Sequence, residues 1–583
     1  MSEQTTGKRD VTRRRFLVTM SATVGLTGGL AMLQACAPAA PSAPKPTESK
    51  PAEAAKPAAD AKPAAAPPTA APPPTAIAKP ADVKPAEASK PQAAPASQAP
   101  RGTFTFATDQ NAATLDPALI KREPVKAMSL LMMETLVKFD DPQNPKFVPW
   151  LAKSWTTSQD GKTWTVKLQE HVKFHDGTPF NAEAVKFTYD RLKDPKVAAT
   201  EAVARLGILE RVDAVDATTV NFVTKQPYAD FVLAMTDPGT AIVSPTAAQK
   251  GAVADFGRAP VGTGPYKFVE WQGTEAAVAV PNGDYWGPQK ALMERVTLKA
   301  IPEAGAMIAG LEAGEIDYIS SVAPAYYERL KGNSKLRVST HTPSAAFIMG
   351  VLTVKQPFDD VRVRQALMYA VDRDTIIKTI LRGLAVPATS PLWPGNPYRV
   401  EQTPYNYDPA KAKQLLTEAG YGSGFKMAIL FSGFAPQPDI CQAYGEYYSQ
   451  VGIEVDLQQR EDAVWAQLVR AKDNARDLFL QSKGGIGTDF NLNRLYSGEF
   501  LDEDNRGRWV DPRIEEMLPK ARESFVDADR AKIYAEMQKI IWENVPELFA
   551  WHPQTVIAQK TEVQGAVFMP WAITYLHGVT KSS

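Results

Sequence analysis

The spacing of hydrophobic positions predicts alternating strands and helices from Arg101 onward. Apolar and polar residues alternate over 102–107, which predicts a strand. A second alternating stretch, 155–166, has Asp160-Gly161 at its centre, a dipeptide typical of a tight turn between two strands. Because helical spacing follows in later segments, the body of the chain is expected to have an α/β fold.

Three segments have the 3.6-residue spacing of amphipathic helices. The first follows Asn181, a residue suited to cap a helix N-terminus. The second follows Asp359-Asp360, and the third begins at Asp408-Pro409 and ends at Gly420. Their expected inward faces consist of Val185, Thr188, Tyr189 and Leu192; of Val363, Ala366, Leu367, Ala370 and Val371; and of Ala412, Leu415, Leu416 and Ala419.

The N-terminus has the three parts of an export signal, which are basic residues, an apolar run and small residues. We therefore interpret residues 1–35 as a signal peptide. Arg13 and Arg14, before Phe-Leu, resemble the twin-arginine signal. Residues 33–36, Leu-Gln-Ala-Cys, resemble a bacterial lipoprotein box, in which Cys36 receives the lipid. The alternative is an uncleaved membrane anchor. With a cleaved signal peptide or an uncleaved anchor, the rest of the chain is expected outside the cytoplasmic membrane.

Residues 36–100 differ from the body in composition. Ala and Pro dominate this segment, Lys-Pro recurs along it, and none of residues 37–100 is aromatic. Such a composition cannot bury a core, so a disordered, semi-rigid linker is expected. At about 3.1 Å per residue in polyproline form, its upper limit is on the order of 200 Å.

Composition restricts the function classes. The chain has 583 residues, and 65 Lys and Arg balance 65 Asp and Glu, which argues against a nucleic-acid partner. Two cysteines and five histidines argue against a disulfide scaffold and a multi-histidine metal site. Cys441, the one cysteine of the body, is expected to be a small buried residue on a helix.

Motifs of catalysis are absent from the sequence, and no catalytic residue, metal or cofactor is expected. Neither Gly-x-Ser-x-Gly nor His-Glu-x-x-His occurs. Gly262-Thr263-Gly264-Pro265 is followed by Tyr-Lys-Phe rather than Lys-Ser/Thr, so it indicates a structural turn, not a phosphate loop. His171 and His175 lie in a strand-and-loop segment, where a four-residue spacing does not pair them for a metal.

Four segments in order carry a family resemblance. They are Leu151–Trp155 with Asp160–Trp164 and Val172–Gly177; Val261–Tyr266 with Asp284–Trp286 and Gly314–Asp317; Pro357–Ala366 with Ala370–Arg373; and Tyr407–Pro409 with Leu415–Tyr421. Together they resemble the family 5 solute-binding proteins of ABC importers, which include dipeptide-, oligopeptide- and nickel-binding proteins. The resemblance extends over about 102–583.

The resemblance implies a type II periplasmic-binding-protein-like fold, a monomer with two lobes and an additional smaller domain. Lobe I is expected at about 101–136, 262–345 and 546–583, the additional domain at about 137–261, and lobe II at about 346–545. The protein partners implied are an ABC permease and its ATPase subunits.

A glycine-rich stretch is the first candidate for ligand contact. Gly485 and Gly487 let backbone approach closely, so free amides and carbonyls there would pair with an extended peptide. Asp489 matches the aspartate that binds the ligand ammonium in peptide-binding members of the family. Ile486 replaces the family's tryptophan, so a loop with a turn aspartate stays an alternative.

Other candidates lie outside that stretch. Asp109 and Gln110 follow the first strand, where open α/β sheets commonly bind ligand, although Asp109 would equally cap a turn. Trp393 lies between prolines and would line the pocket or cover a loop. Arg362 and Arg364 are expected off the apolar helix face, in solvent or beside carboxylates.

These features predict an extracytoplasmic, lipid-anchored receptor that captures a solute, with a di- or oligopeptide as the first candidate. A non-peptide solute, such as a metal chelate or a sugar, is the first alternative. An extracellular hydrolase and a structural lipoprotein are the others.

Overall fold

The computed structural model describes residues 99–142, 145–197, 199, 206–471, 476–485, 487–570 and 573–582. The predictions for Arg13, Arg14, Cys36 and the remainder of 1–98 lie outside the described residues, as does the prediction for Ile486.

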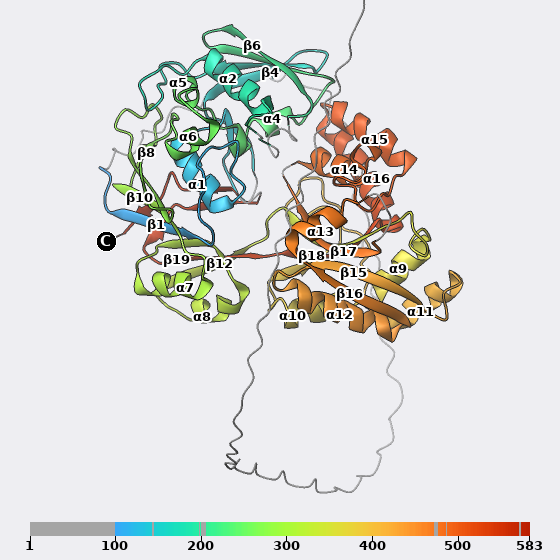
Figure 1. The fold of residues 1–583 in the computed structure, drawn as a ribbon. Helices are drawn as coiled ribbons and strands as arrows, with labels where there is room; N and C mark the ends of the chain where they lie inside the picture. Colours follow the sequence, from blue (N-terminus) through green and yellow to red (C-terminus); the bar gives the residue numbers. More distant parts are fainter. Residues whose placement is uncertain are drawn as a thin grey trace, which may run out of the picture. The chain divides into compact units, whose positions relative to one another are not determined.

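A seven-stranded mixed sheet forms the first lobe (Figure 1). Its strands, in spatial order, are β12 (Leu336–His341), β19 (Thr555–Lys560), β11 (Tyr318–Val322), β1 (Thr103–Thr108), β10 (Arg295–Ala300), β9 (Ala276–Pro281) and β8 (Tyr266–Gln272). The predicted first strand is thus confirmed as β1, which runs parallel to β10 and β11. Phe104 and Phe106 on β1 are buried in one core cluster with Met128 and Leu131 of α1 (Glu123–Met132).

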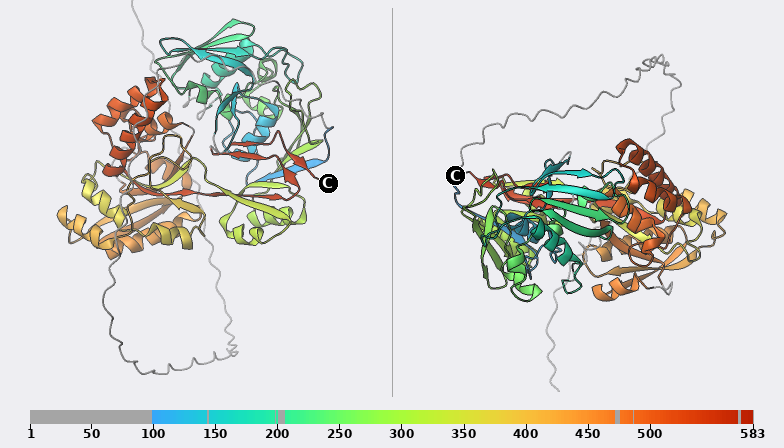
Figure 2. Two further views of the ribbon diagram at one scale, coloured as in Figure 1. Left: turned by 180° about the vertical axis from the view of Figure 1, so that it is seen from behind. Right: turned by 90° about the horizontal axis from the view of Figure 1, so that it is seen from above.

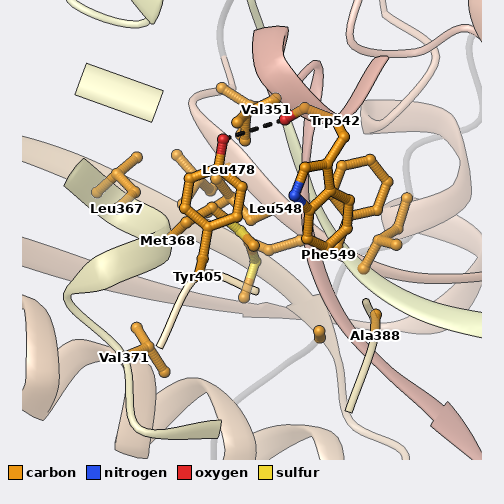
Figure 3. Packing of buried hydrophobic residues seen from close by; sticks show 14 of the residues in the cluster. Val351, Leu367, Met368, Val371, Ala388, Tyr405, Leu478, Trp542, Leu548 and Phe549 are labelled. Atoms are coloured by element: carbon orange, nitrogen blue, oxygen red, sulfur yellow. Dashed lines mark hydrogen bonds between the residues drawn. The ribbon is translucent and has the colours of Figure 1, made fainter. Parts of the chain in front are cut away.

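A six-stranded mixed sheet forms the second lobe. Its strands, in spatial order, are β14 (Ala385–Pro387), β18 (Glu547–Pro553), β13 (Ala345–Val351), β17 (Leu478–Gly484), β15 (Phe425–Ser432) and β16 (Ile453–Arg460). Its core contains Val351, Leu478 and Phe549 from the strands, and Tyr405, whose hydroxyl donates to the Trp542 carbonyl at 3.1 Å (Figure 3).

Helices pack around the second sheet. They are α9 (Val361–Tyr369), α10 (Arg373–Thr379), α11 (Pro409–Glu418), α12 (Gln437–Gln450), α13 (Asp462–Leu468), α14 (Thr488–Tyr496), α15 (Pro512–Glu523) and α16 (Asp527–Asn544). Two predicted caps are confirmed, because the Asp360 side chain accepts from Arg362 N and that of Asp408 from Lys411 N. Cys441 is on α12 and fully buried, as predicted.

A smaller antiparallel sheet lies within the range expected for the additional domain. Its order is β4 (Ala152–Thr157), β5 (Thr163–Leu168), β7 (Thr219–Thr224) and β6 (Leu209–Asp216), and α2 (Ala182–Lys193) packs on it. Gly161 has a φ of 69° in the β4–β5 turn, and the Asn181 side chain accepts from Ala184 N at the start of α2. The predicted hairpin and cap are both confirmed.

The remaining elements are short or lie on the first lobe. They are β2 (Val137–Phe139), β3 (Phe147–Pro149), α4 (Phe231–Ala234), α5 (Pro245–Ala248), α6 (Val253–Arg258), α7 (Ala304–Ala313), α8 (Tyr327–Lys331), β20 (Val563–Gln564), β21 (Val567–Met569), β22 (Ile573–Tyr575) and β23 (Thr580–Lys581), with 3₁₀ turns at Pro238–Thr240, Pro324–Tyr326 and Gly498–Phe500.

The chain passes between the two large sheets twice, from β12 to β13 and from β18 to β19 (Figures 1 and 2). The second passage is at Gln554, between Pro553 and Thr555, and not near Pro546 as expected. The expected boundary is too early because β18 pairs with β13 and β14 of the second sheet. Strand pairing decides this boundary, and periodicity carries no information on pairing partners.

Arg364 corrects another expectation. It is only 4% exposed, and its guanidinium donates to four backbone carbonyls, those of Phe358, Asp359, Asn544 and Val545. Arg362, in contrast, is exposed and pairs with Asp360 at 2.6 Å, as expected. The helical pattern missed Arg364 because a long side chain can cross to the C-terminal end of another helix, here α16.

Candidate functional site

The loop between β17 and α14 is held by its own side chains and by the passage between the sheets. Gly487 has a φ of 98°, and a Cβ there would come within 2.7 Å of Leu233 in the additional domain. The Asn491 amide donates to the carbonyls of Gly485 and Gly487 at 3.0 and 2.6 Å. The φ of Gly487 therefore favours glycine, and a larger residue there would also have to displace the end of the Leu233 side chain.

The backbone of Gly485 is less available than predicted. Its N–H donates to the Ser344 carbonyl at 3.1 Å, and the Ser344 N–H donates to the Pro570 carbonyl of the first lobe at 2.6 Å. The loop is thus bonded directly to the segment that joins β12 to β13. A peptide cannot use the Gly485 amide without breaking that bond, so the expectation of a free amide there is wrong for this conformation.

Asp489 lies in the first turn of α14 and is 2% exposed. Arg522 Nε donates to its Oδ2 at 3.1 Å, whereas its Oδ1 has no hydrogen-bond partner in the part of the chain described here. Burial raises the pKa of Asp489 to about 6, even though the charge of Arg522 opposes the shift. A buried carboxylate oxygen without a donor is costly unless a ligand supplies one.

Asp489 belongs to a charged cluster that joins the second lobe to the additional domain. Arg530 pairs with Asp230 at 2.5 Å and with Asp527 at 3.0 Å, so it joins α16 to the residue before α4. The Ala229 N–H donates to the Arg522 carbonyl at 3.0 Å in the same region. Burial also raises the pKa of Asp230, while Arg530 opposes that shift.

A cavity of about 540 Å³ opens beside this cluster. Its walls come from the additional domain and from the second lobe. Its lining includes Lys225, Tyr228, Asp489, Phe490, Arg494 and Arg522. The volume falls in the range of small-molecule sites, and Asp489 is one of its walls.

The other predicted residues line separate cavities. Asp109 is exposed at the end of β1 and lines a cavity of about 170 Å³ in the first lobe. Gln110 Oε1 accepts from Arg122 Nε at 2.9 Å, and Arg122 lines that same cavity. Trp393 is 6% exposed in the second lobe and lines a crevice with Gly484 and Asn491. The structure therefore brings Trp393, but not Asp109, to the glycine loop.

The Gly262–Pro265 segment is a structural turn, as predicted. A Cβ on Gly262 or Gly264 would come within 2.3 or 2.4 Å of the Met132 or Leu131 carbonyl oxygen. His175 contacts the Gly264 carbonyl at 2.9 Å, which ties this turn to the additional domain.

The sequence analysis did not find three residues of the charged cluster beside the cavity. Arg522 lies in the last turn of α15 and Arg530 in the first turn of α16, whereas Asp230 precedes α4 and is 300 residues from Arg530. The sequence neighbours of these residues carry no sign of their contact in the fold. No group of three or more His, Cys, Asp or Glu side chains suited to a metal occurs among the described residues. No helix in the described ranges is long and apolar enough to cross a membrane.

Comparisons with known proteins agree with this architecture. The glutathione-binding protein GsiB of Escherichia coli (strain K12) is 29% identical over 475 residues, covering 80% of this chain and 91% of GsiB. DppA from Helicobacter pylori, solved in complex with the peptide STSA, is 25% identical with a TM-score of 0.68, covering 82% of this chain and 98% of DppA. NikA from Brucella suis, solved in complex with Fe(III)-EDTA, is 26% identical with a TM-score of 0.74, covering 82% of this chain and 100% of NikA.

The family comparison covers the central part of the chain. Residues 146–500 match the bacterial extracellular solute-binding proteins, family 5. This match spans more than half of the chain. The two large sheets and the two passages between them agree with the two-lobe fold that the resemblance implied. The chain belongs to the family 5 bacterial extracellular solute-binding proteins, the extracytoplasmic binding components of ABC importers.

Proposed function

We propose that this protein captures a di- or oligopeptide with a free ammonium group and delivers it to an ABC permease. The observation that carries the proposal is the unpaired Oδ1 of buried Asp489, beside a cavity of about 540 Å³. An ammonium group is the ligand chemistry that satisfies a buried carboxylate best, through a charge-assisted hydrogen bond.

The pairing in the cluster leaves this oxygen available. Arg522 donates to Oδ2 of Asp489, and Arg530 pairs with Asp230 and with the exposed Asp527. Two guanidinium groups thus balance the two buried carboxylates, and the ammonium group is proposed as the hydrogen-bond donor that Oδ1 lacks. The relatives GsiB and DppA, named for or solved with glutathione and a peptide, are consistent with this choice.

Ligand capture follows from the origin of the cavity walls. Because the walls belong to two domains, a peptide between them gains contacts from both only when the domains approach. Binding therefore shifts the population toward the closed form. The permease, with its ATPase subunits, then receives the solute from that form.

Native mass spectrometry of the body, residues 101–583, tests the proposal after expression in peptide-rich medium. A narrow range of co-purified peptides is expected, and their removal followed by competition should give the length preference. The Asp489→Asn variant should retain at most about a tenth of the wild-type affinity, since a charge-assisted hydrogen bond contributes about 1.5–3 kcal/mol. Recovery of a single metal chelate or sugar would replace the peptide by a non-peptide solute, and unchanged peptide affinity in Asp489→Asn would remove the ammonium anchor.

We further propose that the chain is exported through Arg13 and Arg14 and held at the membrane by lipid on Cys36, as a monomer. The Cys36→Ser variant of the full chain is expected to move from the membrane fraction to the soluble one. Detergent phase partitioning measures this change, and a variant that stays in the membrane fraction would favour an uncleaved anchor.

A further inference from the structure

The cavity of about 170 Å³ in the first lobe lies where two parallel strands end. Thr108 is the last residue of β1, and Ser320 and Ser321 lie near the carboxyl end of β11. Glu123, the first residue of α1, also lines the cavity. Ligands of open α/β sheets commonly bind at the carboxyl ends of parallel strands, so this cavity has the position of a binding site.

Two buried polar atoms at this cavity lack a hydrogen-bond partner among the described residues. They are Oε1 of Glu123 and Oγ1 of Thr108, and Thr108 is only 2% exposed. The other carboxylate oxygen of Glu123, Oε2, accepts from Ser320 Oγ at 2.5 Å. Burial raises the pKa of Glu123, while Ser320, Thr574 and Lys126 oppose the shift. A buried carboxylate oxygen of this kind is costly unless a ligand donates to it.

The charged groups of the lining favour a positively charged donor. Among the described residues, Asp109 and Glu123 give the lining two carboxylates, and Arg122 gives it one guanidinium group. Arg122 Nε donates to Gln110 Oε1 at 2.9 Å, and Oε1 of Glu123 receives no hydrogen bond from it. Lys126, whose charge acts on Glu123, lies outside the lining. A cationic donor therefore suits the free oxygen of Glu123 better than a neutral one.

Apolar side chains make up much of the remaining lining. Met307, Ile319 and Phe568 are buried there. Apolar walls suit methylene groups, and a buried carboxylate suits an ammonium group, which together are the parts of a lysine side chain. The volume is several times the roughly 30 Å³ that a water molecule occupies in the liquid, so the methylene groups and the ammonium group have room.

We propose that the cavity lined by Glu123 and Thr108 binds a primary alkylammonium group. The group belongs to a lysine side chain of the captured peptide or to a free alkylamine. The peptide source rests on the proposed function, whereas the free alkylamine does not. The ammonium group donates to Oε1 of Glu123 and to Oγ1 of Thr108, and each of these atoms thereby gains the partner that it lacks.

Two matched peptide pools test the proposal. Casein is digested with a glutamate-specific protease, either unmodified or after acetylation of its lysine side chains, so the digestion leaves free N-termini in both pools. The full chain, purified in detergent and freed of ligand, is mixed with equal amounts of the two pools, and native mass spectrometry identifies the bound peptides. Wild-type protein is expected to enrich lysine peptides about tenfold or more over their acetylated forms, because acetylation removes the charge of the donor.

Three variants assign the enrichment to the cavity. Glu123→Gln removes the charge and keeps an acceptor for Ser320, so the enrichment should fall to about twofold or less. Glu183→Gln removes the same charge at an exposed position in the first turn of α2 and should keep the wild-type enrichment. Thr108→Val deletes a hydroxyl that has no partner in the described chain, so the fold should be kept and the enrichment should fall severalfold.

The source of the alkylammonium group is identified with n-butylamine, which reproduces the end of a lysine side chain. It is titrated alone by isothermal titration calorimetry. Binding at micromolar concentration that is lost in Glu123→Gln identifies a free alkylamine as the ligand. Enrichment of lysine peptides without such binding identifies the lysine side chain.

The outcomes separate this site from the proposed function. Equal binding of both pools by wild-type protein, without binding of n-butylamine, overturns the alkylammonium site and leaves peptide capture intact. Unchanged enrichment in Glu123→Gln also overturns the site, and Thr108→Val decides in the same way if Glu123→Gln does not fold. Failure of both pools to bind overturns peptide capture. In that case the site stands only if n-butylamine binds the wild type and not Glu123→Gln.

Discussion

The affinity for peptide should fall as pH falls, because Asp489 must lose its proton before it can bind an ammonium group. Burial raises the pKa of Asp489 to about 6. A bound ammonium group favours the carboxylate, so the peptide binds the deprotonated form. Above pH 6 the affinity should be nearly constant, and below it each pH unit should weaken binding about tenfold. Between pH 7 and pH 5 the expected loss is therefore roughly tenfold.

The stability of the free protein should change in the opposite direction. The folded pKa of Asp489 lies above the value of about 3.9 in unfolded chains, so between about pH 4 and pH 6 the folded protein binds the extra proton. The contribution of Asp489 to the free energy of unfolding therefore increases as pH falls through 6, and it is lost as pH rises through 6. This contribution is at most about 3 kcal/mol, because the folded and unfolded pKa values differ by about two pKa units at 1.36 kcal/mol each.

Isothermal titration calorimetry with one recovered peptide, in buffers of different ionisation enthalpy, measures both the affinity and the protons released. Asp230, Arg522, Arg530 and Tyr534 also face Asp489, and Asp230 has a raised pKa of its own. The comparison with Asp489→Asn isolates the Asp489 contribution, since that variant should show no pH slope between 5 and 7 beyond the one due to Asp230. Asp439→Asn, an exposed acid on α12, should retain the wild-type slope. A flat wild-type profile, or a slope as steep in Asp489→Asn as in the wild type, would refute the reasoning.

Three further predictions concern the framework. Arg364→Met should lower the free energy of unfolding by about 3–5 kcal/mol in urea titrations, because it leaves several buried carbonyls without donors, whereas Arg362→Met at an exposed site should change it little. Equal effects in the two variants would contradict this difference. Asn181→Ala should cost about 1 kcal/mol through loss of the α2 cap, measured in the same way, and no loss would mean that the cap is dispensable. Since burial raises the pKa of the Cys441 thiol, Ellman's reagent should label the native body, residues 101–583, only on unfolding; rapid native labelling would place Cys441 at the surface.

Local signals in the sequence were sufficient for many elements. The β4–β5 hairpin, the caps at Asn181, Asp360 and Asp408, and the buried helical faces depend on neighbours within a few residues, so the sequence predicts them directly. The long-range features were less accessible. The second passage between the lobes lies at Gln554 because β18 pairs with β13, about two hundred residues earlier in the chain.

The candidate site also combines local features that the sequence predicts with long-range features that it does not. The sequence by itself determined the α/β character, the family resemblance and the glycine loop ending at Asp489, because those signals lie in contiguous segments. Only the tertiary structure placed Arg522, Arg530 and Asp230 around Asp489, and Thr108 and Ser320 at the cavity of Glu123. Burial and the pKa of a carboxylate depend on groups that are near in space, whatever their separation along the chain. The buried carboxylate oxygen on which the proposed ligand depends is therefore a property of the folded protein, and periodicity and composition carry no record of it.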